Sequence, residues 1–525
     1  MTVPSTSLLM PGGLLVENSR VGLFSLRRDL IPAVLLAAAV SEAVLDDGGF
    51  NPGPREIFGG LAAAALASAV HTDRRAALAA ARRPVAVVLW LLAGLGAISA
   101  IWTEGLVGDS LRWGLVTAGY GAVYVSTVVL VERHRHAPAA VAIGICALAT
   151  ISALVGLVAA ASFNPLFADY IRGTWRPGGT LEYSAALSLL VVSALPVALV
   201  GMCRRSRRVI VPATLAGAVC AASLALGRSR AEIALAAVIA LVAIAIPQRT
   251  VRVSRMRAAG AVGTLLVAGV GARLVMGQAV SLRATPHTAR ALVELALVCL
   301  MPAGLWVSAA TRSQPVPRMR SRTRRLAAVA VGVLVASSLA GGLTLASAAH
   351  QPRYVAHNAS AGFWHGRLTL WAKTIETAED RPLIGGGADG FLAASIRYQR
   401  SSPIRFAHDL PLELAAELGI VGFLLALGLY ATSARALWKA RATAGAWMLA
   451  PAAAAFLVAN LIDWPWHLAG CGAVWAAALG ALSGSRGIPW RPDTSPILMF
   501  IDPCDDTEQT PPWNSTEPNT CGLSL

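Results

Sequence analysis

The sequence has little charge. Only 14% of its 525 residues are charged and 56% are hydrophobic, whereas soluble globular domains carry about 25% charged residues. Water is a poor solvent for a surface of this composition, so the low charge argues against an ordinary soluble enzyme or binding protein. A membrane protein is expected instead.

Two kinds of motif are missing as well. Seven cysteines are present, but five of them lie within or at the ends of apolar runs and show no paired spacing, which argues against a disulfide framework or a metal site. These five are Cys146, Cys203, Cys220, Cys299 and Cys471. The chain also has no D-x-D motif, so it lacks an obvious carboxylate pair for a metal-bridged nucleotide-sugar mechanism.

The chain does contain a series of long apolar runs. Candidate spans lie near residues 30–45, 57–70, 84–102, 114–131, 138–163, 184–202, 209–227, 231–246, 258–276, 290–310, 326–346, 418–437, 445–462 and 468–484. Runs of about 15–25 apolar residues match a hydrocarbon core about 30 Å thick. Because a backbone in lipid must satisfy its polar groups internally, each run should be a helix. The expected fold is an all-α polytopic membrane bundle of about 12–14 spans, with one large extracytoplasmic loop that contains amphipathic helices.

Arginine clusters predict the orientation. The net charge is +16, from 44 Lys and Arg against 28 Asp and Glu, and the basic residues fall in alternate short loops. The clusters are Arg27 and Arg28; Arg74, Arg75, Arg82 and Arg83; Arg133 and Arg135; Arg204, Arg205, Arg207 and Arg208; Arg249, Arg252, Arg255 and Arg257; and Arg318, Arg320, Arg322, Arg324 and Arg325. This alternation is the positive-inside pattern, and it explains the charge better than nucleic-acid binding does. It predicts a multi-pass protein of the inner or plasma membrane with both termini cytoplasmic.

This topology divides the chain into four parts. They are an N-terminal transmembrane bundle (1–346), a large extracytoplasmic loop (347–417), C-terminal transmembrane helices (418–484) and a tail (485–525). The tail is rich in Pro, Thr and Asp and is predicted to be disordered and cytoplasmic. Loops at 164–183, 228–230 and 463–467 face the same side as the large loop, so the four could converge on one site.

Two of those extracytoplasmic loops carry arginines, which short outside loops normally avoid. The four are Arg172, Arg176, Arg228 and Arg230. One interpretation is that they snorkel to lipid phosphates. The other is a guanidinium fork for a phosphate or pyrophosphate, since arginine binds such groups bidentately and does not deprotonate. Glu182 and Glu232 lie close enough in sequence to orient Arg176 and Arg230.

His408 is the candidate catalytic base. It stands where the large loop meets a span, and Asp409 follows it. A neutral imidazole near pH 7 can accept a hydroxyl proton, and general-base help accelerates a reaction roughly 10²–10⁴-fold. A lone surface histidine is usually inert, and a metal site of His357, His365 and His408 is a further alternative, although its spacing matches no known ligand pattern. No metal and no cofactor are expected.

A short helix and a glycine turn precede His408. The residues on one expected helical face are Leu368, Trp371, Ile375 and Ala378; their spacing predicts an amphipathic helix. The segment Gly385–Gly390 reads GGGADG and formally fits the dinucleotide pattern. Because it follows a helix and not a strand, a chain reversal is expected there and not a nucleotide site.

The loop Asp463–His467 reads DWPWH. Trp464 and Trp466 are predicted to lie in an aromatic belt at headgroup level. Asp463 at the same boundary could pair with an arginine of another loop, and the structural and functional interpretations are equally supported.

These residues together resemble the signature region of the O-antigen ligase / Wzy polymerase superfamily of bacterial polytopic membrane proteins. The family pattern runs as R-x3-W, a P-x2-G-x-G turn, and H-N-x4-E-x3-E-x-G. Here the positions are filled by Arg367, Trp371, Pro382, Gly385, Gly387, His408, Glu413, Glu417 and Gly419. Asp409 stands where the family usually has Asn. The resemblance covers roughly residues 170–480, and the segments RPGGTLEYSAA and SRAEIAL are similar to the family's two upstream arginine motifs.

The resemblance implies a metal-independent glycosyltransferase whose donor is an undecaprenyl-diphosphate-linked glycan. The acceptor would be a hydroxyl of a glycan, lipid or protein at the outer membrane surface, among membrane lipids. In this scheme Arg176 and Arg230 hold the lipid diphosphate and stabilise it as it leaves, while His408 activates the acceptor hydroxyl and the amphipathic helix excludes water. Further candidate substrate-binding residues are Arg172, Arg228, Arg367, Trp371, Glu413, Glu417 and Asp463.

Two alternatives stay open. The same residues fit a Wzy-type polysaccharide polymerase, which would use the same kind of donor. A polytopic transporter or flippase is less well supported, because transporters place ionisable residues near span centres. In this chain the middles of the predicted spans are nearly free of ionisable residues, and Arg273 and Glu294 are the main exceptions.

Overall fold

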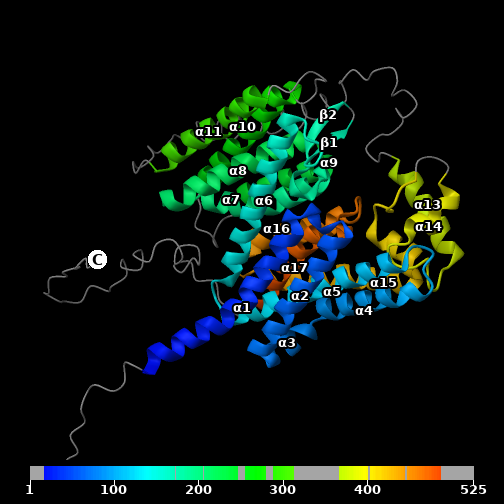
Figure 1. Cartoon of the computed structure of the whole chain (residues 1–525). Helices are drawn as coiled ribbons and strands as arrows, with labels where there is room; N and C mark the ends of the chain where they lie inside the picture. Colours follow the sequence, from blue (N-terminus) through cyan, green and yellow to red (C-terminus); the bar gives the residue numbers. More distant parts are fainter. Residues whose placement is uncertain are drawn as a thin grey trace, which may run out of the picture.

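The structure, a computed structural model, describes residues 17–171, 173–204, 206–245, 255–279, 288–311, 366–399, 403–443 and 446–485. These residues are almost entirely helical (Figure 1), which confirms the predicted all-α class. The helices are α1 (Glu17–Leu45), α2 (Pro52–Thr72), α3 (Arg74–Ala81), α4 (Pro84–Ile98), α5 (Val107–Arg133), α6 (Ala137–Ser162), α7 (Ser184–Met202), α8 (Arg207–Gly227), α9 (Arg230–Ala245), α10 (Arg255–Ala279), α11 (Thr288–Thr311), α13 (Arg367–Asp380), α14 (Phe391–Ser395), α15 (Leu410–Ala440), α16 (Ala446–Ala459) and α17 (Ala469–Gly484).

The remaining regular elements are short. The 3₁₀ helices are η1 (Asp47–Gly49), η2 (Ser99–Ile101), η3 (Gly179–Leu181), η5 (Ile396–Tyr398) and η6 (Pro465–His467), and the strands are β1 (Ala168–Ile171) and β2 (Thr174–Pro177). The two strands form an antiparallel hairpin in which Asp169 pairs with Arg176 and Tyr170 pairs with Trp175. This hairpin lies in the predicted 164–183 loop.

The helices account for the predicted spans. Eight helices of the described chain are long and apolar enough to cross a membrane, and three shorter apolar helices cover Leu30–Leu45, Ala446–Ala459 and Ala469–Gly484. Each predicted span that falls on described residues coincides with a helix. The predicted span at 326–346, the tail from 486 onward and most of the large loop before residue 366 lie outside the described residues. The chain is therefore a multi-pass helical membrane protein.

The core of the bundle lies between α5 and α17, which approach closely because α17 carries glycines on the contacting face. A Cβ at Gly472 would lie 2.1 Å from the ring of Tyr120, and one at Gly480 would lie 2.7 Å from the Tyr124 carbonyl oxygen. Small residues at such contacts allow helix backbones to approach closely in membranes. The helices α1, α2 and α4 pack around this pair.

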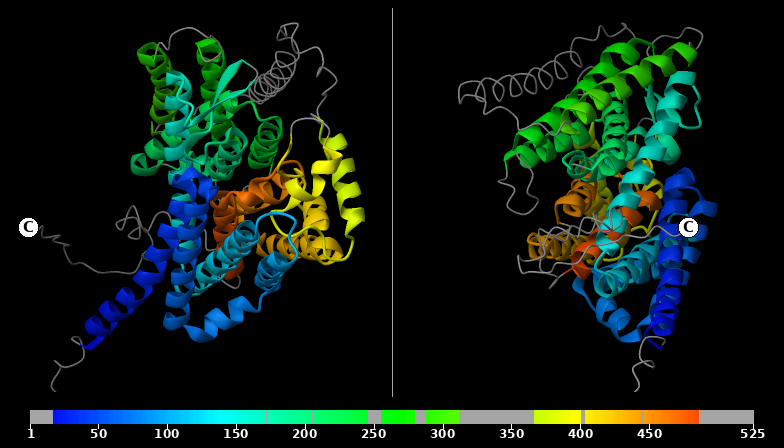
Figure 2. Two further views of the ribbon diagram at one scale, coloured as in Figure 1. Left: turned by 45° about the vertical axis from the view of Figure 1, so that its right-hand side comes forward. Right: turned by 90° about the vertical axis from the view of Figure 1, so that its left-hand side faces the viewer.

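A second group of helices, α6 to α11, packs beside the first (Figure 2). Within it α8 and α10 run parallel: a Cβ at Gly217 would meet Leu265, and one at Gly269 would meet Ala225. The C-terminal ends of α8 and α10 are therefore side by side. The hairpin packs on α6 and α8 at that end.

The structure adds two details to the predictions for the large loop and the span after it. The helix containing the predicted span at 418–437 begins earlier, at Leu410, and is kinked at Gly419, whose φ is +66°. In α13 the predicted apolar face is only partly covered. Leu368 is 58% and Ile375 47% exposed, whereas Trp371 is half-buried and Ala378 packs against a buried apolar cluster. The fully buried positions of the helix are Leu370, Thr374 and Thr377. The helix packs on α15 and α14, and periodicity alone does not tell which side neighbouring elements will cover.

Candidate functional site

The predicted extracytoplasmic loops meet at one end of the bundle, on the right in Figure 1. Tyr183, just before α7, hydrogen-bonds Asp463 in the loop after α16. The Arg367 side chain at the start of α13 donates to the carbonyl of Ile462. Three loops that are far apart in sequence therefore contact one another.

His408 and Asp463 form the centre of this arrangement. The Nδ1 atom of His408 lies 2.9 Å from Oδ1 of Asp463, and the His408 side chain is 22% exposed. When Nδ1–H donates to the carboxylate, Nε2 carries the lone pair and can accept a proton from a bound hydroxyl. Asp463 was predicted to pair with an arginine, and its partner here is the candidate base itself.

Tyr183 completes the set of donors to Asp463. Its hydroxyl donates to the carboxylate, 3.2 Å from Oδ1 and 3.1 Å from Oδ2, and the backbone N–H of Trp464 adds a bond of 3.0 Å. Burial, and next the adjacent Asp463, raise the pKa of the Tyr183 hydroxyl well above its ordinary value. The hydroxyl therefore stays a donor at neutral pH and holds the carboxylate toward His408.

The backbone at His408 is unusual. Its φ is +58°, a left-handed conformation that costs a residue with a Cβ roughly 1–2 kcal/mol. The segments on either side hold it in place. Glu413 accepts the N–H of Ala407 at 2.6 Å, and Asp409 caps α15 by accepting the N–H of Leu412 at 3.0 Å. Asp409 thus fills a helix-capping role that its carboxylate performs as well as an amide oxygen would.

Glu413 and Glu417, predicted as substrate-binding residues, are engaged with backbone groups of neighbouring segments. Both are buried. The carboxylate of Glu413 also contacts Nε2 of His467, and Glu417 accepts the N–H of Phe391 at 3.1 Å. In these positions they hold backbone segments, and their role in substrate binding stays a prediction.

The hairpin presents Arg176 opposite Asp169. Asp169 accepts the N–H of Ser184 at 2.7 Å. This bond ties β1, the strand paired with the one that carries Arg176, to the residue that follows Tyr183. The acidic partners predicted for the arginines make other contacts. Glu232 accepts a hydrogen bond from the Ser229 hydroxyl, and Glu182 lies beside Asp47.

Three guanidinium groups gather near the C-terminal ends of α8 and α10. Arg228 caps α8 with φ +57°, Arg273 lies one turn beyond the contact of Gly269 with α8, and Arg176 comes from the hairpin. Burial, followed by the like charges of Arg273 and Arg176, lowers the pKa of Arg228 to about 10. Nη1 of Arg273 is buried without a hydrogen-bond partner among the described residues. We call this set the arginine cluster.

Not every predicted residue reaches the centre. Arg230, predicted as catalytic, is exposed at the start of α9, so Arg228 is the more enclosed of the two. Trp371 is half-buried on α13. Arg172 lies outside the described residues, as do His357 and His365.

Aromatic rings connect the site to the interior. Trp464 stacks on Tyr183 at 4.7 Å and on Phe406 at 4.8 Å, and Phe406 stacks on His467 at 4.0 Å between ring centroids. Trp466 does not lie in a surface belt as predicted: it is fully buried against Tyr120. The loop turns inward because His467 and Trp466 are both anchored in the core.

Sequence reasoning missed Tyr183, Asp389 and Arg55. Tyr183 stood in a recognised arginine motif, but no spacing rule linked it to Asp463. Asp389 was interpreted only as part of a turn. Arg55 lies at the start of an apolar run, and nothing in the sequence distinguishes it from other arginines. Only the structure shows that it is buried.

The fold and this polar centre define a multi-pass helical membrane protein with a site at one end of the bundle. Residues 289–427 match the family model described as O-antigen ligase. This match confirms the resemblance to the O-antigen ligase / Wzy polymerase superfamily, and it supports a membrane glycan ligase or polymerase in general terms. It covers α13, the glycine turn and His408. No curated protein matches the chain.

Proposed function

We propose that the protein is a membrane glycosyltransferase of the O-antigen ligase type. It transfers a glycan from an undecaprenyl-diphosphate-linked donor to an acceptor hydroxyl on the extracytoplasmic side. The observation that carries this proposal is the His408–Asp463 pair, a partly exposed base oriented by a buried carboxylate, on the same end of the bundle as the arginine cluster.

In the proposed reaction His408 accepts the proton of the acceptor hydroxyl at Nε2. The hydroxyl oxygen then attacks the anomeric carbon of the donor, and the bond from that carbon to the diphosphate oxygen breaks. Asp463 holds the imidazole in the required tautomer and stabilises it once protonated. The lipid diphosphate leaves as an anion.

The arginine cluster is proposed to bind that diphosphate. Guanidinium groups remain charged and match phosphate geometry with paired donors, and an anion between them would relieve their mutual repulsion. Arg228 and Arg176 are the central members, and Arg230 serves at the exposed rim. No metal is needed in this scheme, because the arginines neutralise the leaving group.

The orientation follows from the arginine-rich loops. Both termini are proposed to be cytoplasmic, and the site then faces the outer surface, where a lipid-linked donor and an acceptor can meet. The same geometry serves a polymerase of the Wzy type, in which the acceptor hydroxyl belongs to another lipid-linked glycan.

Reconstitution in liposomes tests this function. With a lipid-diphosphate-linked oligosaccharide and candidate acceptors supplied on the accessible side, we expect a new glycosidic product and release of the lipid diphosphate. Single-repeat acceptors distinguish ligase from polymerase, because a polymerase extends the donor glycan itself. Donor movement across the bilayer without any glycosidic product would replace the proposal with a flippase.

A further inference from the structure

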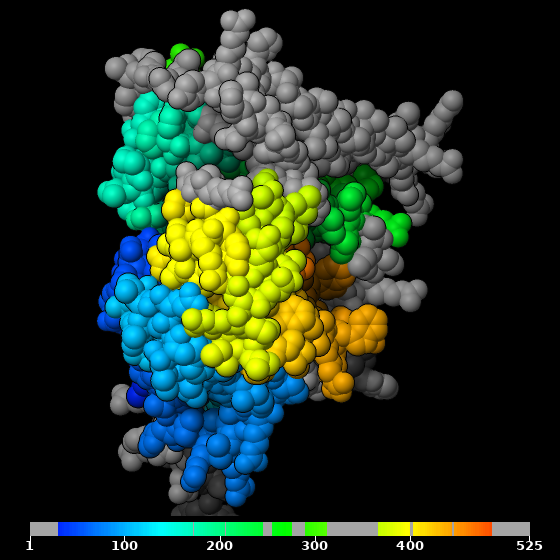
Figure 3. All heavy atoms as spheres, turned by 90° about the vertical axis from the view of Figure 1, so that its right-hand side faces the viewer, coloured from blue at the N-terminus to red at the C-terminus, as the bar shows by residue number. Residues whose placement is uncertain are grey.

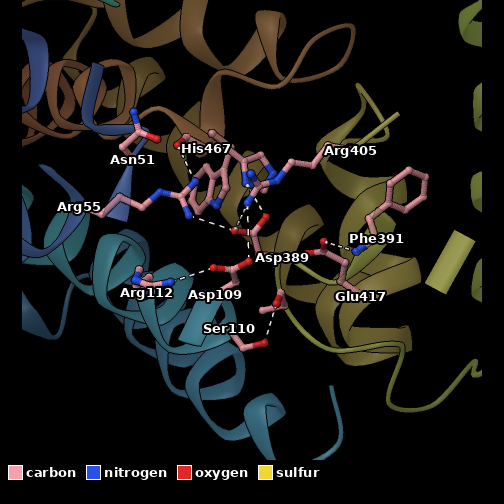
Figure 4. Close-up of polar contacts among 12 residues, drawn as sticks. Asn51, Arg55, Asp109, Ser110, Arg112, Asp389, Phe391, Arg405, Glu417 and His467 are labelled. Atoms are coloured by element: carbon pink, nitrogen blue, oxygen red, sulfur yellow. Dashed lines mark hydrogen bonds and ion pairs between the residues drawn. The ribbon is translucent and has the colours of Figure 1, made fainter. Parts of the chain in front are cut away.

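A buried ionic network ties together the segments that carry His408 and Asp463. Its members are Arg55, Asp389, Glu413 and His467, and Figure 4 labels all of them except Glu413. Nη1 of Arg55 lies 3.0 Å from Oδ2 of Asp389, with the two side chains only 4% and 1% exposed. The other carboxylate oxygen of Asp389 lies 3.8 Å from Nδ1 of His467, whose Nε2 contacts Glu413. We call this set the ionic network.

The network joins four parts of the chain. Arg55 comes from α2, Asp389 from the glycine turn, Glu413 from α15 and His467 from the loop after α16. Arg55 also donates through Nη2 to the carbonyl of His467 at 3.3 Å. The guanidinium group therefore bridges the glycine turn and the 463–467 loop directly.

Both members of the His408–Asp463 pair depend on segments that this network holds. Glu413 binds the N–H of Ala407, the residue before His408. His467 terminates the short loop that begins with Asp463. Ala407 and His467 both contact the carboxylate of Glu413. This shared contact limits how far His408 and Asp463 can move apart.

The conformation of His408 makes this support necessary. A non-glycine residue with positive φ persists only where its surroundings impose that backbone. The network supplies the constraint on the Ala407 side, while the Asp409 cap supplies it on the other.

We propose that Arg55 is a positioning residue for His408 that acts through the ionic network. The inference rests on the proposed function for its kinetic consequence, but not for its structural one. Without Arg55 the buried carboxylate of Asp389 loses its closest and only buried cation among the described residues. It keeps Arg405, whose Nη2 lies 3.4 Å from the same oxygen but whose side chain is 41% exposed. A buried charge with weaker pairing is unfavourable. The glycine turn and the 463–467 loop then separate, and His408 loses its alignment with Asp463.

The test compares Arg55→Gln with a matched variant at the other end of the bundle. Arg83→Gln also removes an arginine that ties helices together, through the carbonyl of Ser483 at 2.6 Å and the side chain of Glu132. Both variants should unfold at lower temperature than the wild type. Only Arg55→Gln should lower kcat per folded molecule, by about 10²-fold, the effect of misplacing a reacting group by about 1 Å. KM for the lipid-linked donor should stay unchanged.

A conservative variant sharpens the result. Arg55→Lys keeps the charge beside Asp389 but gives up one of the two donors, so its kcat should lie between those of the wild type and Arg55→Gln. A loss of kcat that merely follows the folded fraction in all three variants would overturn the proposal.

A second readout is independent of catalysis. Diethyl pyrocarbonate modifies accessible imidazoles, and peptide mass spectrometry can follow His408 alone. We expect His408 to react several-fold faster in Arg55→Gln than in the wild type or in Arg83→Gln. If the wild type makes no glycosidic product while this difference appears, the proposed function fails and the positioning role stands. Equal labelling rates in the three proteins would overturn the positioning role.

Discussion

Arg228 illustrates how a binding residue can weaken the unliganded fold. Its guanidinium group is partly buried beside Arg273 and Arg176, and its pKa is lowered to about 10 by burial and by these like charges. Arg228→Gln should therefore stabilise the ligand-free protein, by up to about 1 kcal/mol, since a half-exposed charge is screened by solvent. A melting curve in detergent measures this change.

Arg228→Gln should also reduce the effect of a bound anion on the melting temperature. Inorganic pyrophosphate is expected to raise the melting temperature of the wild type, because binding to the folded state alone stabilises it. In Arg228→Gln that rise should be largely lost. A variant that is less stable than the wild type yet responds fully to pyrophosphate would contradict this role for Arg228.

Asp169, in the hairpin, should make the stability of the protein depend on pH. Burial raises the pKa of Asp169, although the Ser184 N–H and Arg176 partly oppose the shift. A carboxyl group with a raised pKa in the folded state contributes stability that is complete below its ordinary pKa and is lost as the pH rises through the folded value. Relative to Asp169→Asn, the wild type should therefore lose stability as the pH rises above about 4, the ordinary pKa of an aspartate. Melting temperatures of the two proteins across this range test the sign, and a constant difference would contradict it.

At the residue scale, the candidate base and the candidate arginines could be predicted, because each interrupts an apolar pattern at the edge of a span. Their partners could not. Asp463 is 55 residues from His408, and only the packing of the loop after α16 brings the two together. Arg228 and Arg230 are nearly equivalent in sequence, and the left-handed cap of α8 decides which of them is enclosed.

At the scale of elements, the glycine turn and the kinked helix α15 interlock. Gly385 has φ +66°, and a Cβ there would lie 2.2 Å from the backbone carbon of Glu417. Gly385→Ala should therefore cost more than about 3 kcal/mol, since backbone atoms on both sides would have to move. Chemical denaturation or thermal melting measures the loss.

Gly366 provides the matched control. It also has a positive φ, +79°, but nothing lies within 4 Å of a Cβ placed there. Gly366→Ala should cost only the conformational term of about 1 kcal/mol. Equal losses in the two variants would show that the contact with Glu417 is unimportant.

Long elements were easier to predict than short ones. Spans such as α7 and α8 are continuous apolar runs, so their bounds agree with the structure within a few residues. The hairpin has strands of four residues, too short for an alternating pattern to stand out. For α13 the helix was predicted and is present, but the side that its neighbours cover depends on the contacts with α15.

At the scale of the whole molecule, the sequence predicted the all-α membrane class, and it predicted that the large loop and three shorter loops lie on the same side of the membrane. The space-filling view shows α13 and its neighbours packed against the light-blue part of the N-terminal helices (Figure 3). That contact depends on the loop after η2, where Glu104 N–H donates to the Gly386 carbonyl at 2.7 Å. No periodicity in either segment indicates it.

The proposed orientation can be measured with cysteine labelling. The five described cysteines are buried, and Cys504 and Cys521 belong to the tail proposed to be cytoplasmic. A membrane-impermeant maleimide should therefore label the protein only after the cells are permeabilised. With Thr369→Cys, an exposed position on α13, labelling should occur in intact cells. Labelling of the wild type in intact cells, with Thr369→Cys labelled only after permeabilisation, would show that the topology is the reverse of the one proposed.

The central claim is that one site binds the lipid diphosphate through arginines and activates the acceptor through His408. The most direct measurement determines donor affinity and turnover together for the reconstituted wild type, His408→Ala and Arg176→Gln. The account predicts that His408→Ala binds the donor like the wild type but turns over at least about 10²-fold more slowly, whereas Arg176→Gln binds it markedly more weakly. Turnover within twofold of the wild type in both variants would contradict the account.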